Sequence, residues 1–552
     1  MGVSLLWAEG KAPAPPARLP AESAWLADLG VDTLARALAY DSRRSGVTLG
    51  LLAALAQDAA LISYRQAILA DFLACEELGD AVAELIPSLQ ELQLLGREKA
   101  VADENQLLTI LRRLRELELY VEVLERLLSV LAACRERFCS AGLLALHRWL
   151  QEQANAPEFC RLKQALPQLR KSLHHPAAVT VGINLDDTGS PVAATLLSIE
   201  ERPFGRRKGL LSRLLFGEAD DSRPADLAPL HELSPRGTNP LLDPLFRDLE
   251  RILRASCRPV AQALTSFAHL SGTRLGALAD ELAFYVGATR LFRRLRAAGL
   301  PLCRPRMLPK EERACRFRGL YSINLALRLL DHGPPPGMPA RPIPSDVSLG
   351  PEGRCCVLTG PNLGGKTTFL QAVGLAHVLA QAGLLVPGIE AEISPVDAIY
   401  THFPKEERMD RGTGRLGEEA QRLAAIFASA TPYSLVLLNE SLASTSPGEA
   451  LYLGRDVLAA LRLLGARAIY ATHLHDLAEN LHELDLRAPG EPPTVSLVAK
   501  IAAGQSEALG RTFRIEPGPP QGRSFAAEVA SAFGISFAQL RQKLRERGLI
   551  PE

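Results

Sequence analysis

Residues 355–371, CCVLTGPNLGGKTTFLQ, form the stretch that decides the fold of the C-terminal part of this chain. The apolar run Cys355–Leu358 is typical of a buried strand, and a helical pattern begins at Thr368. Between them, residues 360–367 fit the pattern G-x-x-x-x-G-K-[ST] of a phosphate loop. Because a preceding strand and a following helix are the context that this pattern requires, the stretch predicts a nucleotide-binding site.

The residue types of the loop suit a triphosphate. Glycines let successive backbone N–H groups curl around phosphate oxygens, and the start of the helix adds partial positive charge. Lys366 supplies a full charge to the β- and γ-phosphates, and the Thr367 hydroxyl can ligate Mg²⁺. We therefore expect ATP and Mg²⁺ as ligands. The candidate ATP-binding residues are Gly360, Pro361, Asn362, Leu363, Gly364, Gly365, Lys366, Thr367 and Thr368.

Downstream of the loop, short apolar runs alternate with helical patterns. Two of these runs are SLVLLNE at 434–440 and ARAIYATH at 466–473. Strands that alternate with helices predict an α/β domain with a largely parallel sheet. We assign this domain to residues 331–552, and its first part, 333–353, has the composition of a linker.

Polar residues end both of those runs. Asn439 stands where phosphate-loop ATPases usually place an Asp that holds Mg²⁺ through water, so we expect an uncharged metal contact and slow turnover. Glu440 is the candidate catalytic residue that polarises the attacking water, with a solvated carboxylate as the alternative. His473 is a candidate sensor of the γ-phosphate, because imidazole can donate a hydrogen bond to it.

The chain before residue 331 has a different pattern. Residues 1–20 include the Pro-rich segment KAPAPPARLP and predict a flexible tail, and residues 21–330 are mainly helical. One helix is predicted over 105–138. The runs 177–186 and 191–200 predict a β-hairpin, within an insertion at about 176–222. The expected fold class is therefore multidomain, with a helical region that carries a small β insertion and a following α/β phosphate-loop domain.

Composition narrows the class of protein. The chain has 552 residues, enough for two to four domains, with 62 Lys+Arg and 62 Asp+Glu. A formal charge of zero argues against wrapping of nucleic acid by bulk charge, although a local basic stripe remains possible. Nine scattered cysteines suggest reduced thiols. We expect no membrane-spanning segment and no signal peptide, and hence a cytoplasmic protein.

Four segments together resemble the MutS family of DNA mismatch-repair and recombination ATPases. TGPNLGGKTTFLQAVGLAHVLAQAGLLVP (359–387) is similar to the family's phosphate loop and the helix after it. NESLASTSPGEA (439–450) takes the place of the second ATPase motif, and IYATHLHDLAE (469–479) is similar to its His-containing switch. FRIEPGPPQGRSFAAEVASAFGIS (513–536) is similar to the segment that closes the domain. These motifs cover about residues 330–540, and the resemblance upstream is less specific.

The resemblance implies an ABC-type ATPase domain that works as a homodimer, with core and lever helices upstream. Each composite site would take a signature element from the second subunit, here within 410–427. The family's Ser/Thr falls on Gly414 and Arg415, while Glu419 keeps the acidic position. Arg415 is then either a charged donor to the γ-phosphate or a solvated residue at a helix start. As a departure from the family, we expect no mismatch-reading domain, because the helical core follows directly on the first 20 residues, and no appended nuclease after residue 545.

The partner implied by the resemblance is duplex or branched DNA, in DNA repair or recombination control without mismatch reading. Candidate phosphate contacts are Arg206, Arg207, Lys208 and Arg213, in a basic piece where the family places a clamp; a solvated basic loop is the alternative. Two other functions remain open. One is a nucleotide-switched protein that binds a protein partner, and the other is a degenerate ATPase that binds ATP with little hydrolysis.

Overall fold

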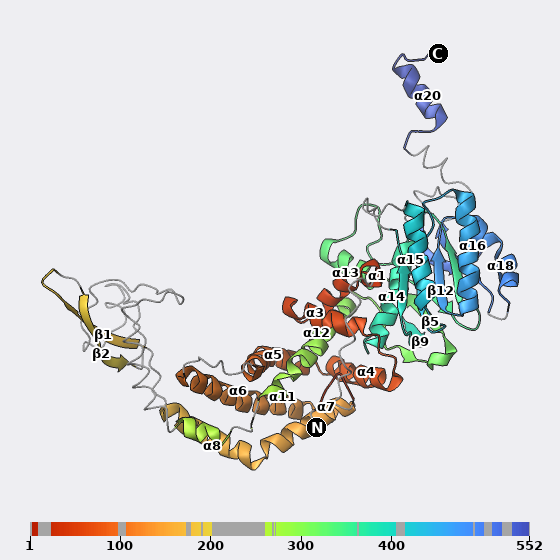
Figure 1. The fold of residues 1–552 in the computed structure, drawn as a ribbon. Helices are drawn as coiled ribbons and strands as arrows, with labels where there is room; N and C mark the ends of the chain where they lie inside the picture. The colour runs from red at the N-terminus through yellow and green to blue at the C-terminus, as the bar shows by residue number, and fades with distance from the viewer. Residues whose placement is uncertain are drawn as a thin grey trace. The chain divides into compact units, whose positions relative to one another are not determined.

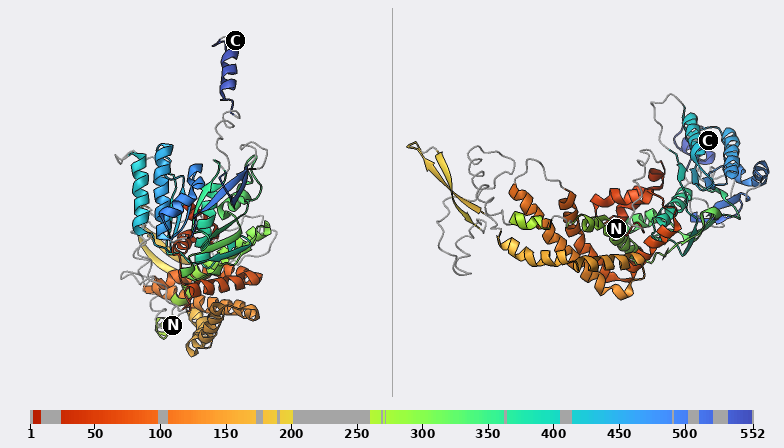
Figure 2. Two further views of the ribbon diagram at one scale, coloured as in Figure 1. Left: turned by 90° about the vertical axis from the view of Figure 1, so that its right-hand side faces the viewer. Right: turned by 60° about the horizontal axis from the view of Figure 1, so that its bottom comes forward.

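The structure is a computed structural model, and it divides the chain into two compact units (Figures 1 and 2). One unit comprises Met1–Ile86, Val130–Arg148 and Leu278–Glu552, and the other comprises Pro87–Ser129 and Trp149–Ala277. The domain bounds expected from the sequence remain a prediction. The residues that the structure describes are 3–8, 24–97, 106–172, 178–188, 191–200, 260–267, 270, 272–361, 364–404, 414–489, 492–501, 511–520 and 533–550.

Residues 3–8 are packed against the first unit. Leu5 is fully buried, and its backbone N–H donates to the Glu281 carboxylate at 2.6 Å. The Arg65 guanidinium donates to the Leu6 carbonyl and lies 4.5 Å from the ring centre of Trp7. The prediction of a flexible tail is therefore wrong for these residues, because apolar side chains at the start of the chain find a buried site. Residues 9–23 lie outside the described part.

Helices make up most of the residues that the structure describes before position 298. The long helix predicted at 105–138 is confirmed as Gln106–Ala133, but it ends earlier, and a turn at Cys134 leads into a short 3₁₀ segment. Thr273–Gly276 and Leu278–Ala297 are two separate helices, with Ala277 between them. The helices are α1 Ala24–Leu29, α2 Val31–Leu38, α3 Ser45–Ala53, α4 Ala59–Ala74, α5 Glu76–Arg97, α6 Gln106–Ala133, α7 Ala141–Ala154, α8 Pro157–Ser172, α11 Thr273–Gly276 and α12 Leu278–Ala297; 3₁₀ turns are η1 Ser42–Arg44, η2 Arg135–Arg137 and η3 Lys310–Glu312.

The second unit carries the predicted hairpin. β1 (Ala178–Leu185) pairs antiparallel with β2 (Pro191–Glu200), which confirms the sequence prediction. Helices of this unit are joined by surface ion pairs, such as Arg115 with Glu91 between α6 and α5. The four candidate DNA contacts at 206–208 and 213 lie outside the described residues.

A six-stranded sheet forms the centre of the C-terminal part of the first unit. Its strand order is β10-β11-β12-β7-β13-β14, with parallel pairing except between β13 and β14. The strands are β7 Cys355–Thr359, β10 Ile399–His402, β11 Leu435–Asn439, β12 Arg467–Ala471, β13 Val495–Ile501 and β14 Arg511–Pro517. Helices cover both faces, as Figure 1 shows for α14 and α16. The mainly parallel α/β sheet predicted from the alternating runs is thus confirmed.

Capping residues in the sequence explain where the helices beside this sheet begin and end, as α16 shows. α16 starts with Ser446, whose hydroxyl accepts from the Glu449 N–H, followed by Pro447 in the first turn, and ends at Gly465 with φ of 69°. Apolar side chains of α15 and α16 pack on one sheet face with Val436, Leu438 and Tyr470. The remaining helices are α13 Ile323–His332, α14 Lys366–Gln381, α15 Arg415–Ser429, α16 Pro447–Leu464, α17 His475–Glu479, α18 Leu481–Arg487 and α20 Phe537–Glu546.

Two smaller sheets flank this centre. A four-stranded sheet has the order β4-β9-β5-β6, and a two-stranded one pairs β3 with β8. The composition-based linker prediction for 333–353 is wrong for Ser345–Leu349, which forms β6 with alternating buried side chains. The bounds are β3 Leu302–Cys303, β4 Arg306–Met307, β5 Cys315–Leu320, β6 Ser345–Leu349, β8 Val386–Pro387 and β9 Glu390–Ile393. Among the described helices, none combines the length and the apolar character needed to cross a bilayer.

Candidate nucleotide-binding site

The phosphate loop connects the carboxyl end of β7 to the start of α14. Gly360 has φ of 144° and Gly365 has φ of 93°, conformations that favour glycine. A Cβ atom at Gly360 would approach the Ala499 side chain to 2.6 Å, so the chain also has no room for one there. The described glycines of the loop therefore have backbone conformations that suit glycine, and the N-terminal end of α14 faces the site. Asn362 and Leu363, two of the predicted ligands, lie outside the described residues.

Lys366 is held inside this loop by backbone oxygens. Its Nζ donates to the carbonyls of Gly360 and Pro361 at 2.8 and 3.0 Å and lies 3.3 Å from Glu440 Oε1. The side chain is almost fully buried. A buried ammonium fixed at the start of a helix is suited to a phosphate oxygen.

The side chains of Thr367 and Asn439, which are 72 positions apart in the sequence, lie in contact. The Asn439 amide nitrogen lies 3.1 Å, and its amide oxygen 3.3 Å, from the Thr367 hydroxyl. Hydroxyl and amide oxygens are ligand types that Mg²⁺ accepts directly or through water, so the pair fits the predicted metal. Neither residue brings a charge, as the sequence indicated for Asn439.

Glu440 lies between a lysine and a histidine. His473 Nδ1 is 2.6 Å from Glu440 Oε2, while Lys366 contacts the other oxygen. Burial disfavours the charge of Glu440, but the hydrogen bond to His473 and the charge of Lys366 outweigh it, so the pKa of Glu440 lies below its ordinary value. The hydrogen bond to Glu440 also raises the pKa of His473, against the opposing effect of burial. The structure thus brings the two predicted catalytic residues together as a hydrogen-bonded pair.

The turn that carries Glu440 is strained and is held from two strands. Glu440 and Leu442 have φ of 48° and 65°, which bulky residues rarely adopt. Between them, the Ser441 hydroxyl forms a 2.7 Å hydrogen bond with His402 Nδ1 on β10, and the Ser441 carbonyl accepts from the Tyr470 hydroxyl on β12. The Glu440 N–H donates to the Ala471 carbonyl. Sequence reasoning missed this turn, because its partners lie on separate strands.

These groups border one cavity of about 570 Å³. Pro361 and residues 364–368 of the phosphate loop line it together with Asn439 and Glu440, whereas His473 is not part of the lining and contacts Glu440. Sequence reasoning also missed the rest of its wall. Helix α13 with the residues just before it, the segment expected to be a linker and Phe513 of β14 contribute apolar and cationic side chains, and Phe513 has φ of 57°. Members of this wall are Tyr321, Leu325, Arg328, Leu329, Met338, Pro339, Arg341, Pro342, Ile343 and Phe513.

The predicted signature residues lie at the start of α15. Gly414 is the residue before the helix, and Arg415 Nε lies 3.9 Å from Glu419 Oε1. Glu419 is buried, whereas Arg415 is half-exposed. None of the three lines the cavity of this chain, and their role toward a second subunit stays a prediction.

Comparisons with known proteins agree with these features. A family model described as MutS2 N-terminal domain matches residues 57–298, and one described as MutS domain V matches residues 356–537. The chain is 29% identical over 448 residues to Endonuclease MutS2 of Thermomicrobium roseum, covering 74% of this chain and 52% of that protein. It is 35% identical over 214 residues to DNA mismatch repair protein MutS of Granulibacter bethesdensis, covering 39% and 22%. It is 36% identical over 143 residues to DNA mismatch repair protein MutS 2 of Halobacterium salinarum, covering 26% and 17%. The chain thus spans about half the length of these relatives or less.

Proposed function

The chain belongs to the MutS family, and on this premise we propose that it binds and hydrolyses ATP and that the nucleotide controls its hold on a macromolecular partner. The observation that carries the proposal is the meeting of the phosphate loop, Asn439 and Glu440 at one cavity. These groups come from the carboxyl ends of β7 and β11, where ligands bind in sheets of this kind.

The residues divide the work of hydrolysis. Lys366 and the loop amides bind the β- and γ-phosphates of the substrate ATP. Thr367 and Asn439 would hold Mg²⁺, which neutralises phosphate charge when bound. Glu440 accepts a hydrogen bond from the attacking water and orients it toward the γ-phosphorus. His473 holds the second Glu440 oxygen through Nδ1, and its Nε2 is the group that would sense the γ-phosphate.

Hydrolysis tests this part of the proposal. Glu440→Gln keeps the size of the side chain and removes the base, so kcat should fall by about 10²–10⁴-fold with little change in ATP affinity. Glu483→Gln, on the exposed surface of α18, is the matched control. If the two variants hydrolysed ATP equally fast, Glu440 would not be the base.

The proposed partner is duplex or branched DNA, in repair or recombination control. Support comes from the family and from the basic piece at 206–213, which lies outside the described residues. Contacts to phosphates release counterions, so binding should weaken steeply with salt and change when ATP is added. DNA retention by the full chain at two salt concentrations, with and without ATP, measures both effects.

A protein partner is the second candidate, and the hairpin favours it. Residues 178–200 contain Asp186, Asp187 and Glu200 but no Lys or Arg. Four of its large apolar side chains are more than half exposed, namely Ile183, Leu185, Val192 and Leu197. Such a surface repels DNA phosphates and suits an apolar protein surface. Absence of DNA binding at low salt, with ATP still bound, would favour this function.

We also propose a homodimer. α20 (Phe537–Glu546) exposes Phe537, Leu540 and Leu544, which recur at helical spacing along one face. A surface helix with an exposed apolar face is suited to a second copy of the chain, and light scattering with and without ATP measures the association.

A further inference from the structure

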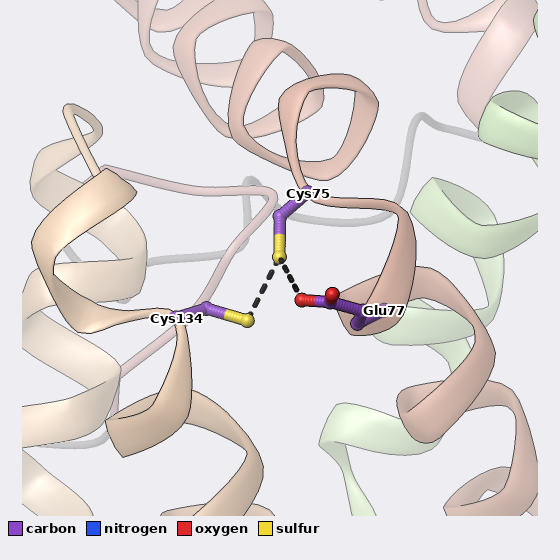
Figure 3. A group of neighbouring side chains, drawn as sticks. All are labelled: Cys75, Glu77 and Cys134. Atoms are coloured by element: carbon purple, nitrogen blue, oxygen red, sulfur yellow. Dashed lines mark hydrogen bonds between the residues drawn. The ribbon is translucent and has the colours of Figure 1, made fainter.

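Two cysteines far from the nucleotide site lie in contact. Cys75 follows α4 directly, Cys134 follows α6 directly, and both side chains are buried. Their sulfurs are 2.8 Å apart, and Figure 3 shows the Cys75 sulfur between the Cys134 sulfur and the Glu77 carboxylate. All of these residues belong to the first unit.

Hydrogen bonds from backbone N–H groups to a carboxylate hold the two segments together independently of the sulfurs. The buried Asp71 carboxylate, in the last turn of α4, accepts from the N–H groups of Cys139 and Ser140 at 3.0 and 2.9 Å. These residues precede α7, a few positions after Cys134. The chain segments are thus already placed so that a bond between the sulfurs needs only a small side-chain movement.

The surroundings favour a bond between the sulfurs over a metal ion. Two thiolates on one tetrahedral zinc would lie about 3.8 Å apart, given Zn–S bonds of about 2.3 Å. Arg137 also lies 3.8 Å from the Cys75 sulfur and 3.3 Å from Glu77, so a cation already pairs with the one carboxylate of the group. A positive charge there repels a metal ion.

We propose that Cys75 and Cys134 are a redox modification site, forming a reversible disulfide when a peroxide is the oxidant. The Cys75 thiolate attacks one oxygen of hydrogen peroxide, the O–O bond breaks, and water leaves after protonation, which gives a sulfenic acid. The Cys134 sulfur then attacks the Cys75 sulfur. The S–S bond forms, the S–O bond breaks, and the hydroxyl leaves with the Cys134 proton as a second water. The two thiols lose two electrons, and the peroxide is reduced to two waters.

The order of attack follows from the surroundings of each thiol. Burial raises the pKa of Cys134 to about 12, so this residue stays a thiol until the sulfenic acid forms. Cys75 has the guanidinium of Arg137 beside it, and the Arg137 side chain is 60% exposed. The Arg137 side chain therefore lies beside Cys75 and also reaches the solvent. A molecule as small as hydrogen peroxide can pass this side chain to reach the Cys75 sulfur.

The disulfide would close residues 76–133 into a loop. This segment contains α5 and α6, and it leaves the first unit after Ile86 and re-enters it at Val130. The disulfide would therefore join the two places in the first unit between which this segment begins and ends. Constraining the unfolded chain in this way should also raise the midpoint of thermal unfolding by several degrees.

Peptide mapping tests the proposal on the full chain. Reduced protein is treated with increasing hydrogen peroxide and digested with trypsin without reductant. The expected product is peptide 127–135 linked to peptide 66–97, which dithiothreitol separates. Cys139→Ser, which removes the exposed thiol nearby, should keep the link, whereas Cys134→Ser should lose it.

Two results would overturn the proposal. One is oxidation of the exposed Cys139 and Cys160 while Cys75 and Cys134 remain free thiols. The other is about one zinc ion per chain in the reduced protein that Cys134→Ser loses, which would make the group a metal site. Neither measurement depends on ATP hydrolysis, so the proposal fails or stands separately from the proposed function.

Discussion

Replacing Ser441 with alanine should lower kcat for ATP hydrolysis by up to about fivefold and leave ATP affinity unchanged. Ser441 lies next to Glu440 and does not line the cavity, so it contacts no substrate. Its hydroxyl bonds to His402 Nδ1 and thereby ties the strained turn to β10. Without that bond, Glu440 would leave its position beside Lys366 and His473 more often.

The expected fall in kcat follows from comparing the free-energy cost of the strained turn with the hydrogen bonds that hold it. Left-handed backbone at Glu440 and Leu442 costs about 1–2 kcal/mol each. The bonds from the turn to His402, Tyr470 and the Ala471 carbonyl contribute about 1 kcal/mol each. The two sums are similar, so losing about 1 kcal/mol shifts the population of the strained turn by up to about fivefold.

The assay is steady-state ATP hydrolysis with a separate measurement of ATP affinity. Ser444→Ala is the matched control, because the buried Ser444 hydroxyl has no hydrogen-bond partner among the described residues. Titration of His473 by NMR gives a second reading. Its pKa is raised by the hydrogen bond to Glu440, so it should fall toward the ordinary histidine value in Ser441→Ala.

Unchanged kcat and unchanged His473 titration in Ser441→Ala would refute the argument that this bond positions Glu440. Equal losses in Ser441→Ala and Ser444→Ala would refute it as well, because the effect would then belong to the loop in general.

Four further predictions concern the site and the dimer. Lys366→Ala should weaken ATP binding by about two orders of magnitude, and unchanged affinity would contradict the phosphate-loop assignment. Asn439→Asp should lower the Mg²⁺ concentration needed for hydrolysis by about tenfold and speed turnover; a variant that is no faster would show that Asn439 is not the weak point. The raised pKa of His473 means that its contribution to stability is complete below about pH 6.5 and is lost as pH rises through the folded-state pKa, so thermal unfolding in His473→Gln should lack this slope. Leu544→Glu on α20 should reduce dimer formation in light scattering without changing ATP affinity, whereas an unaltered dimer would move the interface elsewhere.

Much of the fold was predictable because its signals are local. The long helix before Cys134, the hairpin at 178–200 and the alternation of strands and helices after residue 354 all follow from short-range periodicity. The errors also have local causes. A Pro-rich composition predicts a linker at 333–353, but β6 forms there because its alternate side chains are buried against neighbouring strands. Strands β10 and β14 were not predicted either, because pairing with their partners β11 and β13, more than the pattern of their own residues, decides them.

The sequence alone determined the phosphate loop, because a strand, glycines with φ above zero and a helix start lie within a few consecutive residues and need no distant partner. Only the tertiary structure decided what surrounds it. The contact of Asn439 with Thr367, the bond of His402 to Ser441 and the approach of Cys75 to Cys134 each join residues that are far apart in the chain. Such contacts depend on which strands pair and which helices pack together. A local residue pattern does not determine these pairings, because they form only when the whole unit packs.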